Sequence, residues 1–207
     1  LIIIFMVVFL YKHKTNMSEK PSLSSELTDR STPLEVKVDQ ILRVEAASDI
    51  LPFYNPCQDA ILVDASSGLG GVFDGVGGTK RAEIASATAT ETIGNYYAGA
   101  SEPTDLEAAK ELLYFALVRA DEQIKAVAST LNLPEVPQTT AAVAKLWRDP
   151  ASGDYKLLAA SSGDSRVYVL DPEGVLSQVT VDNVDDTTSD VDVQDAQLYQ
   201  SETSNIL

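Results

Sequence analysis

The feature that most constrains the fold of this chain is a glycine-rich turn between an apolar segment and a helix-forming segment, FDGVGGTKRAE at residues 73–83. Asp74 ends the apolar segment, and three of the four residues that follow it are glycines. Glycine permits a tight turn with exposed backbone amides and carbonyls. The turn therefore suits a metal ligand at Asp74, a phosphate-binding loop, or a simple connection between a strand and a helix. Its spacing is neither that of a Walker A loop nor that of G-x-G-x-x-G.

A second aspartate opens the strand that precedes this turn. The segments DAILVDA and LGGVFDG are short apolar strands separated by SSG, which predicts a hairpin. Asp59 begins the first strand and Asp74 ends the second, so both carboxylates reach the same point if the two strands are neighbours. Two carboxylates and a backbone carbonyl suit a hard cation such as Mg²⁺ or Mn²⁺. Taken alone, Asp59 also suits a turn or a cap.

The other periodic segments predict an α+β fold. Residues 34–46 alternate apolar and polar side chains, as half-buried strands do. Helical spacing predicts helices over residues 79–98 and 105–131, and Thr104 is the expected cap of the second helix. Much of its apolar side is expected to come from Leu106, Leu113, Phe115, Leu117, Ile124 and Val127. Further strands are predicted at residues 139–147, 155–163 and 165–171. A strand pair, two helices and an antiparallel meander place the helices and the sheet in separate layers.

Composition excludes several kinds of chemistry and partner. The formal net charge is -16, from 31 acidic and 15 basic side chains, so the surface repels phosphate backbones and nucleic acid is not expected as a partner. His13 is the single histidine and Cys57 the single cysteine. This inventory excludes an internal disulfide, a thiolate zinc cluster and a histidine-activated nucleophile in the folded region. A reducing cytoplasm is the expected compartment.

The two ends of the chain differ from the segment between them. Residues 1–10, LIIIFMVVFL, would span about 15 Å as a helix, about half of a bilayer's hydrocarbon core. They could end a longer transmembrane helix that anchors the protein to a membrane, or be the remnant of a signal peptide. The favoured interpretation is upstream sequence translated in error, with Met17 as the start. We therefore expect a disordered segment over 1–33, a folded domain over 34–180 and an acidic, disordered or truncated tail over 181–207.

A third polar feature is Gly163-Asp164-Ser165-Arg166, a tight turn between two apolar strands. By itself it needs no explanation beyond a hairpin. In order, however, QDA, a strand, DGVGG opening a helix, a second long helix, TTAAVA, GDSRVYVL and LSQVT resemble the PPM (protein phosphatase 2C-like) family of metal-dependent Ser/Thr protein phosphatases. The resemblance covers roughly residues 50–180, and the combination of DGVGG with GDSR is fairly specific.

The resemblance implies a partial four-layer αββα sandwich that holds a two-metal centre of Mg²⁺ or Mn²⁺ at one end of its sheets. In the family, the metals activate a water that attacks a phosphoryl group of phosphorylated protein substrates. By motif match, Asp59 would ligate one metal, Asp74 would bridge both, and Gly75 would contribute its backbone carbonyl. Asp164 matches an aspartate implicated in a third, weaker metal site in some members.

The sequence departs from the family pattern close to the metal-binding motifs. Val76 stands where many eukaryotic members carry a histidine proposed as general acid, and bacterial members often lack that histidine. The arginine that usually binds the substrate phosphate just upstream of Asp59 is absent. Tyr54 and Asn55 occupy that region, and Arg43 is sixteen residues from Asp59. Without a bidentate phosphate clamp, substrate binding should be weaker.

The later DG and DN aspartates of the family, which complete the metal site, are also missing. Asp182-Asn183 superficially resembles the DN motif but follows LSQVT too soon, and we interpret it as coincidence. We therefore expect a bacterial-type phosphatase fragment, cut at its C-terminus and weakly active or inactive. The alternative is a non-catalytic module that binds a partner or a phosphopeptide. A sugar-kinase-like ATPase would need a second phosphate loop, which the sequence lacks.

Overall fold

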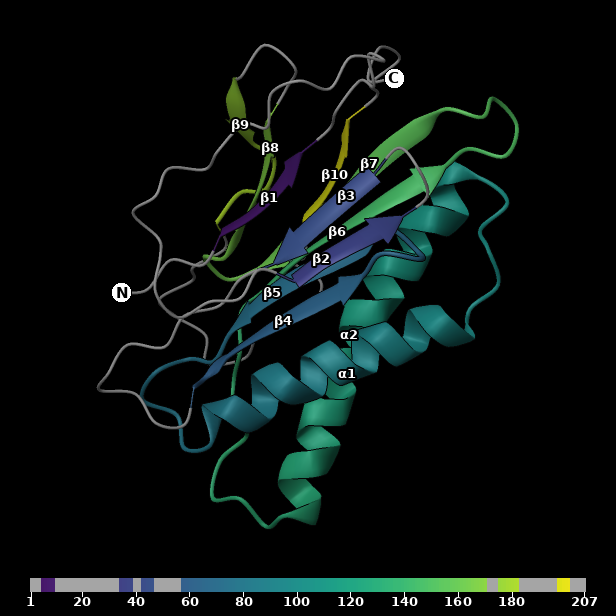
Figure 1. Ribbon diagram of the computed structural model, residues 1–207. Helices are drawn as coiled ribbons and strands as arrows, with labels where there is room; N and C mark the ends of the chain where they lie inside the picture. The colour runs from purple at the N-terminus through teal and green to yellow at the C-terminus, as the bar shows by residue number, and fades with distance from the viewer. Residues whose placement is uncertain are drawn as a thin grey trace.

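The computed structural model describes residues 57–170 and 175–182, together with the backbone of four further strands (Figure 1). A five-stranded antiparallel sheet forms its centre, in the order β10-β7-β6-β5-β4. The strands of this sheet are β4 (Asp59–Asp64), β5 (Leu69–Asp74), β6 (Ala141–Arg148), β7 (Tyr155–Ser162) and β10 (Gln197–Ser201). The predicted hairpin and the first two strands of the meander are confirmed.

Two smaller sheets complete the strands that the structure describes. One has the order β1-β8-β9, with β1 (Phe5–Phe9) parallel to β8 (Arg166–Leu170) and β9 (Leu176–Gln178) antiparallel to it. The other is a hairpin of β2 (Leu34–Val38) and β3 (Leu42–Ala46), which confirms the strands predicted from alternation in residues 34–46.

The two helices, α1 (Ala82–Gly99) and α2 (Leu106–Thr130), lie together on one face of the five-stranded sheet (Figure 1). The core between them and the sheet includes Leu69, Phe73, Ile93, Leu113, Val143 and Trp147. A second cluster fills the opposite face of the sheet, towards β8, and includes Val72, Ala142, Ala144, Leu157, Ala159 and Val167. Alternation along β6 divides its side chains between these two clusters, since successive residues of a strand point to opposite faces.

These contacts make a helix layer, a central sheet and a second sheet, which confirms the expected α+β sandwich. The described residues provide three of the four expected layers. Small side chains on the buried side of α1, among them Ala85, Ser86 and Ala89, let that helix approach the sheet closely. The α1 backbone starts at Ala82, three residues later than predicted, because Gly78 and Arg81 adopt positive φ values of 103° and 66° that a helix excludes.

Two expectations about α2 were wrong. Asp105, not Thr104, caps the helix, and its carboxylate accepts a hydrogen bond from the Ala108 amide at 2.9 Å. The Thr104 hydroxyl instead lies beside the Asp105 carboxylate, at 3.3 Å. Phe115, expected on the apolar side, is 48% exposed, because the buried stripe of α2 runs through Leu113, Ala116 and Leu117. Adjacent positions on a helix diverge by about 100°, so Phe115 turns away from that stripe.

The expectations for the ends of the chain fall largely outside the described residues. Phe5–Phe9 and Gln197–Ser201 are strands, whereas the rest of residues 1–33 and 183–207 is not described. The origin of residues 1–10, the start at Met17 and the state of the tail therefore stay predictions. Within the described part of the chain, no helix is both long and apolar enough to cross a membrane.

Leu113 and Phe115 provide a direct test of the packing of α2. Leu113 is fully buried, so Leu113→Ala should lower the free energy of unfolding by about 2–5 kcal/mol through lost burial and a residual cavity. Phe115→Ala removes a larger but exposed side chain and should change it by no more than about 0.5 kcal/mol. Urea titrations of the two variants measure both values. Equal losses would contradict the observed packing, in which Leu113 faces the core and Phe115 faces solvent.

Candidate metal centre

Asp59 and Asp74 lie directly opposite one another on the paired strands β4 and β5. Their neighbours Ala60 and Phe73 face the helices, so alternation turns both carboxylates to the other face, towards the second sheet. Side chains at directly opposite positions of an antiparallel pair have Cβ atoms about 4.5–5.5 Å apart. The hairpin therefore brings the two predicted residues together, whereas their role as metal ligands stays a prediction.

The electrostatics of this pair favour a bound proton or a cation. Burial, the negative charge of Asp59, a hydrogen bond with Asp59 and the charge of Asp164 together raise the pKa of Asp74 to about 7. Burial also raises the pKa of Asp59, while the hydrogen bond with Asp74 lowers it. Two partly buried carboxylates at this separation repel each other when both are ionised. A divalent cation between them would relieve that repulsion.

Gly75 is required by the close approach of three segments. Its amide donates to the Gln58 carbonyl at 3.0 Å, and the Ser86 hydroxyl donates to the same carbonyl at 2.6 Å. A Cβ at Gly75 would lie 2.6 Å from the Gln58 oxygen and 2.9 Å from the Ala82 oxygen. Only glycine therefore lets the turn pass between the start of β4 and the start of α1.

Two threonines before β6 hold the backbone of Asp74, a role that the sequence analysis missed. The Thr139 hydroxyl donates to the Asp74 carbonyl at 3.0 Å, and the Thr140 amide donates to the same oxygen at 2.8 Å. The Asp74 amide in turn donates to the Thr140 hydroxyl at 3.0 Å. The signal in the sequence was the pair of hydroxyl residues that opens TTAAVA, but their partner lies about 65 positions away.

The turn that carries Asp164 packs against the same threonine. The Thr140 and Ser165 hydroxyl oxygens are 2.6 Å apart and share a hydrogen bond. Gly163 has a φ of 87°, and a Cβ there would lie 2.8 Å from the Thr140 methyl carbon. Asp164 is thereby held near enough for its charge to raise the pKa of Asp74. Among the described residues, however, no group of three or more His, Cys, Asp or Glu side chains is arranged to hold a metal ion.

A cavity of about 110 Å³ lies behind Thr139, between α1, α2 and the start of β6. Its lining includes Ile93, Leu117, Ile124, Val136, Gln138 and Thr139. The lining does not include Asp59, Asp74 or Asp164. The cavity is mainly apolar, so it is a gap in the helix–sheet packing and not the place where the carboxylates meet.

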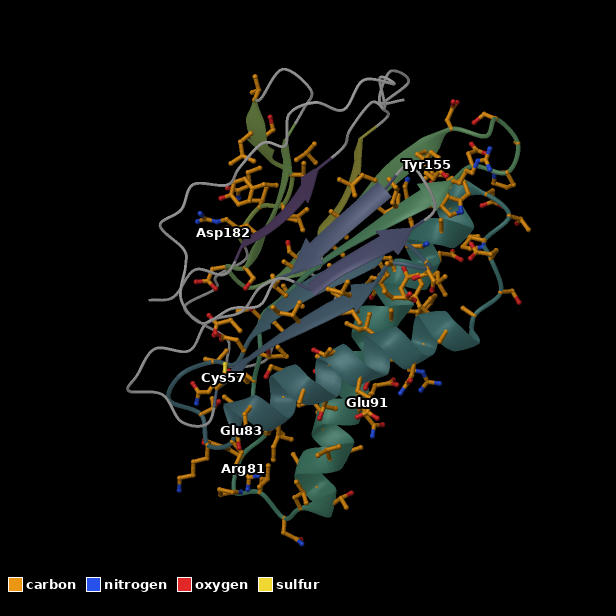
Figure 2. The ribbon with its side chains drawn as sticks, viewed as in Figure 1. Cys57, Arg81, Glu83, Glu91, Tyr155 and Asp182 are labelled. Carbon is orange, nitrogen blue, oxygen red and sulfur yellow. The ribbon has the colours of Figure 1, made fainter. Side chains whose placement is uncertain are left out.

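Figure 2 shows Cys57, just before β4, near Glu83 at the start of α1. The pairing of β4 with β5 brings the start of β4 next to the turn after Asp74. The Ser86–Gln58 hydrogen bond joins the start of β4 to the first turns of α1. Residues 54–203 match the sequence model of Protein phosphatase 2C. The chain belongs to the protein phosphatase 2C family. This confirms the resemblance found in DGVGG and GDSR.

Solved structures agree on the fold of this phosphatase 2C chain. The PPM Ser-Thr phosphatase MsPP from Mycobacterium smegmatis, in complex with cacodylate, is 25% identical, with a TM-score of 0.50, and the match covers 75% of this chain and 53% of that one. Serine/threonine phosphatase Stp1 from Staphylococcus aureus is 20% identical, with a TM-score of 0.55, over 74% of this chain and 53% of that one.

A third similar structure is the catalytic domain of the serine/threonine protein phosphatase PstP in complex with 2 manganese ions. It is 22% identical, with a TM-score of 0.50, and the match covers 74% of this chain and 55% of that one. Comparison with curated proteins finds no significant match. The chain thus spans about half the length of these three solved structures, and it shares the fold of their PPM-type phosphatase domains.

Gly75→Ala should disturb the site through its backbone. The added methyl group would meet two backbone oxygens, so we expect a loss of about 1–3 kcal/mol in the free energy of unfolding. Gly77→Ala is the matched control, because no atom lies within 4 Å of a Cβ at that position. Urea denaturation of both variants tests this, and equal stability of the two would contradict the close approach at Gly75.

Asp74 predicts a pH dependence of stability in the metal-free protein. Its pKa in the fold is about 7, above the ordinary value of 3.8, so between these pH values the folded state keeps a proton that the unfolded state has lost. Stability should therefore fall as the pH rises through this window. Asp74→Asn should remove that fall and stabilise the protein at pH 8 by about 1 kcal/mol, allowing for solvent screening.

Asp64 provides a control of opposite sign. Burial raises the pKa of Asp64, but the hydrogen bonds that its carboxylate accepts from Ser66 and Ser67 together outweigh burial and lower that pKa overall. Its ionised form stabilises the fold above its ordinary pKa, so Asp64→Asn should destabilise the protein at pH 8. Urea midpoints from pH 4 to 8 in the presence of a chelator measure both effects. A shift of the same sign in the two variants would contradict the assignment.

Proposed function

We propose that this chain contributes the first part of the active site of a Ser/Thr phosphoprotein phosphatase that hydrolyses phosphomonoesters. The observation that supports this most directly is the opposed pair of Asp59 and Asp74 beside the turn at Gly75. Family membership supports the same reaction class. The substrates would be phosphorylated proteins in the cytoplasm, and the acidic surface argues against nucleic acid.

The residues of this site fit divalent cations with a preference for oxygen ligands. Mg²⁺ typically keeps several waters and uses only one or two carboxylates of the protein. The Asp59–Asp74 pair would provide two such carboxylates. In our proposal, Asp59, Asp74 and the Gly75 carbonyl would hold the ions of the two-metal centre, with Asp74 shared between them. Asp164 would hold a third ion more weakly. The presence of 2 manganese ions in the similar structure of the PstP catalytic domain supports Mn²⁺ as well as Mg²⁺.

When bound, such cations lower the pKa of a water so that it can attack phosphorus at neutral pH. The protein's own contribution is to fix the positions of the carboxylates before substrate arrives. Thr139 and Thr140 fix the backbone of Asp74 from β6, and Ser86 fixes the Gln58 carbonyl from α1. The Asp74 side chain thus extends from a backbone that is hydrogen-bonded on both its amide and its carbonyl.

Phosphate release by the 207-residue chain tests this proposal. With a phosphothreonine peptide and Mn²⁺, we expect slow release of phosphate, as a partial active site would give, and a chelator should abolish it. Loss of an outer-shell partner of a metal site typically costs 10–100-fold, so the loss of a bridging ligand in Asp74→Asn should lower the rate by at least about 100-fold. Glu122→Gln is the control and should leave the rate unchanged, because Glu122 forms an exposed ion pair on α2.

Other outcomes separate the rival hypotheses. Release that does not need metal, or that Asp74→Asn leaves intact, would contradict the proposed site. Binding of the phosphopeptide without release would support the non-catalytic alternative, a phosphopeptide-binding module. Isothermal titration of the peptide with and without Mn²⁺ measures that binding directly.

A further inference from the structure

Arg166 and Asp182 form a two-pronged ion pair beside the Asp164 turn. Arg166 Nε donates to Asp182 Oδ1 at 2.7 Å, and Arg166 Nη2 donates to Asp182 Oδ2 at 2.5 Å. Arg166 is the last residue of the Gly163–Arg166 turn, and Asp182 follows β9. A guanidinium bound to a carboxylate through two parallel hydrogen bonds is fixed in orientation as well as in position. Figure 2 shows Asp182 on the same side of the molecule as Cys57, which precedes Asp59.

The segment that carries Asp182 is itself fixed along β8. The Val179 amide donates to the Val167 carbonyl at 2.9 Å, and the Val167 amide donates to the Thr180 hydroxyl at 2.9 Å. Val179 and Thr180 are both buried. The Gln178 side chain also donates to the Thr180 carbonyl at 2.7 Å. Asp182 therefore extends from an anchored piece of backbone.

The turn is also held by Thr140, just before β6. Thr140 shares a hydrogen bond with Ser165 and holds the backbone of Asp74 at the same time. Asp164 is thus followed directly by two anchored residues, Ser165, which is hydrogen-bonded to Thr140, and Arg166, which is paired with Asp182. Through Thr140, Ser165 is also linked to the backbone of Asp74.

We infer that Asp182 is a positioning residue, which orients the Asp164 carboxylate towards the Asp59–Asp74 pair by holding Arg166. Its resemblance to a DN metal ligand is misleading, because the Asp182 carboxylate binds Arg166 and both of its oxygens are used. The ion pair also occupies the Nε–Nη2 edge of the guanidinium, and Nη1 donates to the Tyr168 hydroxyl at 3.4 Å, so Arg166 is already engaged within the protein. The role of Asp164 as a cation ligand rests on the proposed function, whereas the fixing of the turn does not.

Substitution of Asp182 tests this inference on the full chain. Asp182→Asn keeps the size of the side chain but loses its charge, and Asp182→Glu keeps the carboxylate. Because the pair is partly exposed, neither change should unfold the protein. Glu122→Gln removes the exposed Arg119–Glu122 pair and is the matched control.

The first measurement is amide hydrogen exchange of residues 163–167 in the metal-free protein. We expect about tenfold faster exchange in Asp182→Asn, near-normal exchange in Asp182→Glu, and an unchanged urea midpoint. The Val167 amide is a suitable reporter because it donates to Thr180 in the anchored segment. Unchanged exchange in Asp182→Asn would overturn the inference, whatever the protein's activity.

The second measurement is Mn²⁺ binding followed by electron paramagnetic resonance. Asp182→Asn should weaken the weakest Mn²⁺ site by about 10–100-fold, and Asp182→Glu should restore most of it. Faster exchange with unchanged Mn²⁺ binding would overturn the part of the inference that concerns Asp164. If the unaltered chain binds no Mn²⁺, the proposed function fails, and the exchange experiment still decides whether Asp182 fixes the turn.

Discussion

The structure depends on one constraint, the cross-strand opposition of Asp59 and Asp74 at the end of the β4–β5 hairpin. Two carboxylates in this arrangement cannot both be ionised without cost, so the fold must supply either a proton or a cation. The surrounding contacts all stiffen that arrangement. Gly75 lets the turn pass between the start of β4 and the start of α1, and Ser86 of α1 holds the same end of β4. Thr139 and Thr140, just before β6, hold the backbone of Asp74. The result is a preorganised acidic site, not a flexible loop with acidic side chains.

Much of this could be predicted from local sequence. The two short apolar segments DAILVDA and LGGVFDG, separated by SSG, predicted the hairpin, and its register places Asp59 opposite Asp74. The strands around the Asp164 turn and the presence of both helices could also be predicted, because each depends on the pattern of apolar residues within one segment. The predicted ligand roles of these aspartates and of Gly75 remain predictions, since they depend on ions and not on backbone geometry.

The rest could not be predicted, because it depends on contacts between distant segments. No periodic pattern links Thr140 to Asp74, Ser86 to Gln58, or Asp182 to Arg166, and each pair becomes visible only when the strands are assembled. The prediction of the N-terminal cap of α2 was wrong for a different reason. Thr104 and Asp105 are both good caps, and the choice between them depends on where the backbone enters the first turn.

The hydrogen bonds between Asp74 and Thr140 span 66 positions of the chain, and this separation has a consequence for the order of folding. The contacts of the β4–β5 hairpin are local and can form early, whereas Thr139 and Thr140 can reach Asp74 only after the two intervening helices have been synthesised. During that interval Asp59 and Asp74 are already neighbours, but the backbone that aims them is free. A nascent or partly unfolded chain therefore presents a loose acidic hairpin, and the fixed geometry of the two carboxylates becomes a property of the completed helix–sheet layer.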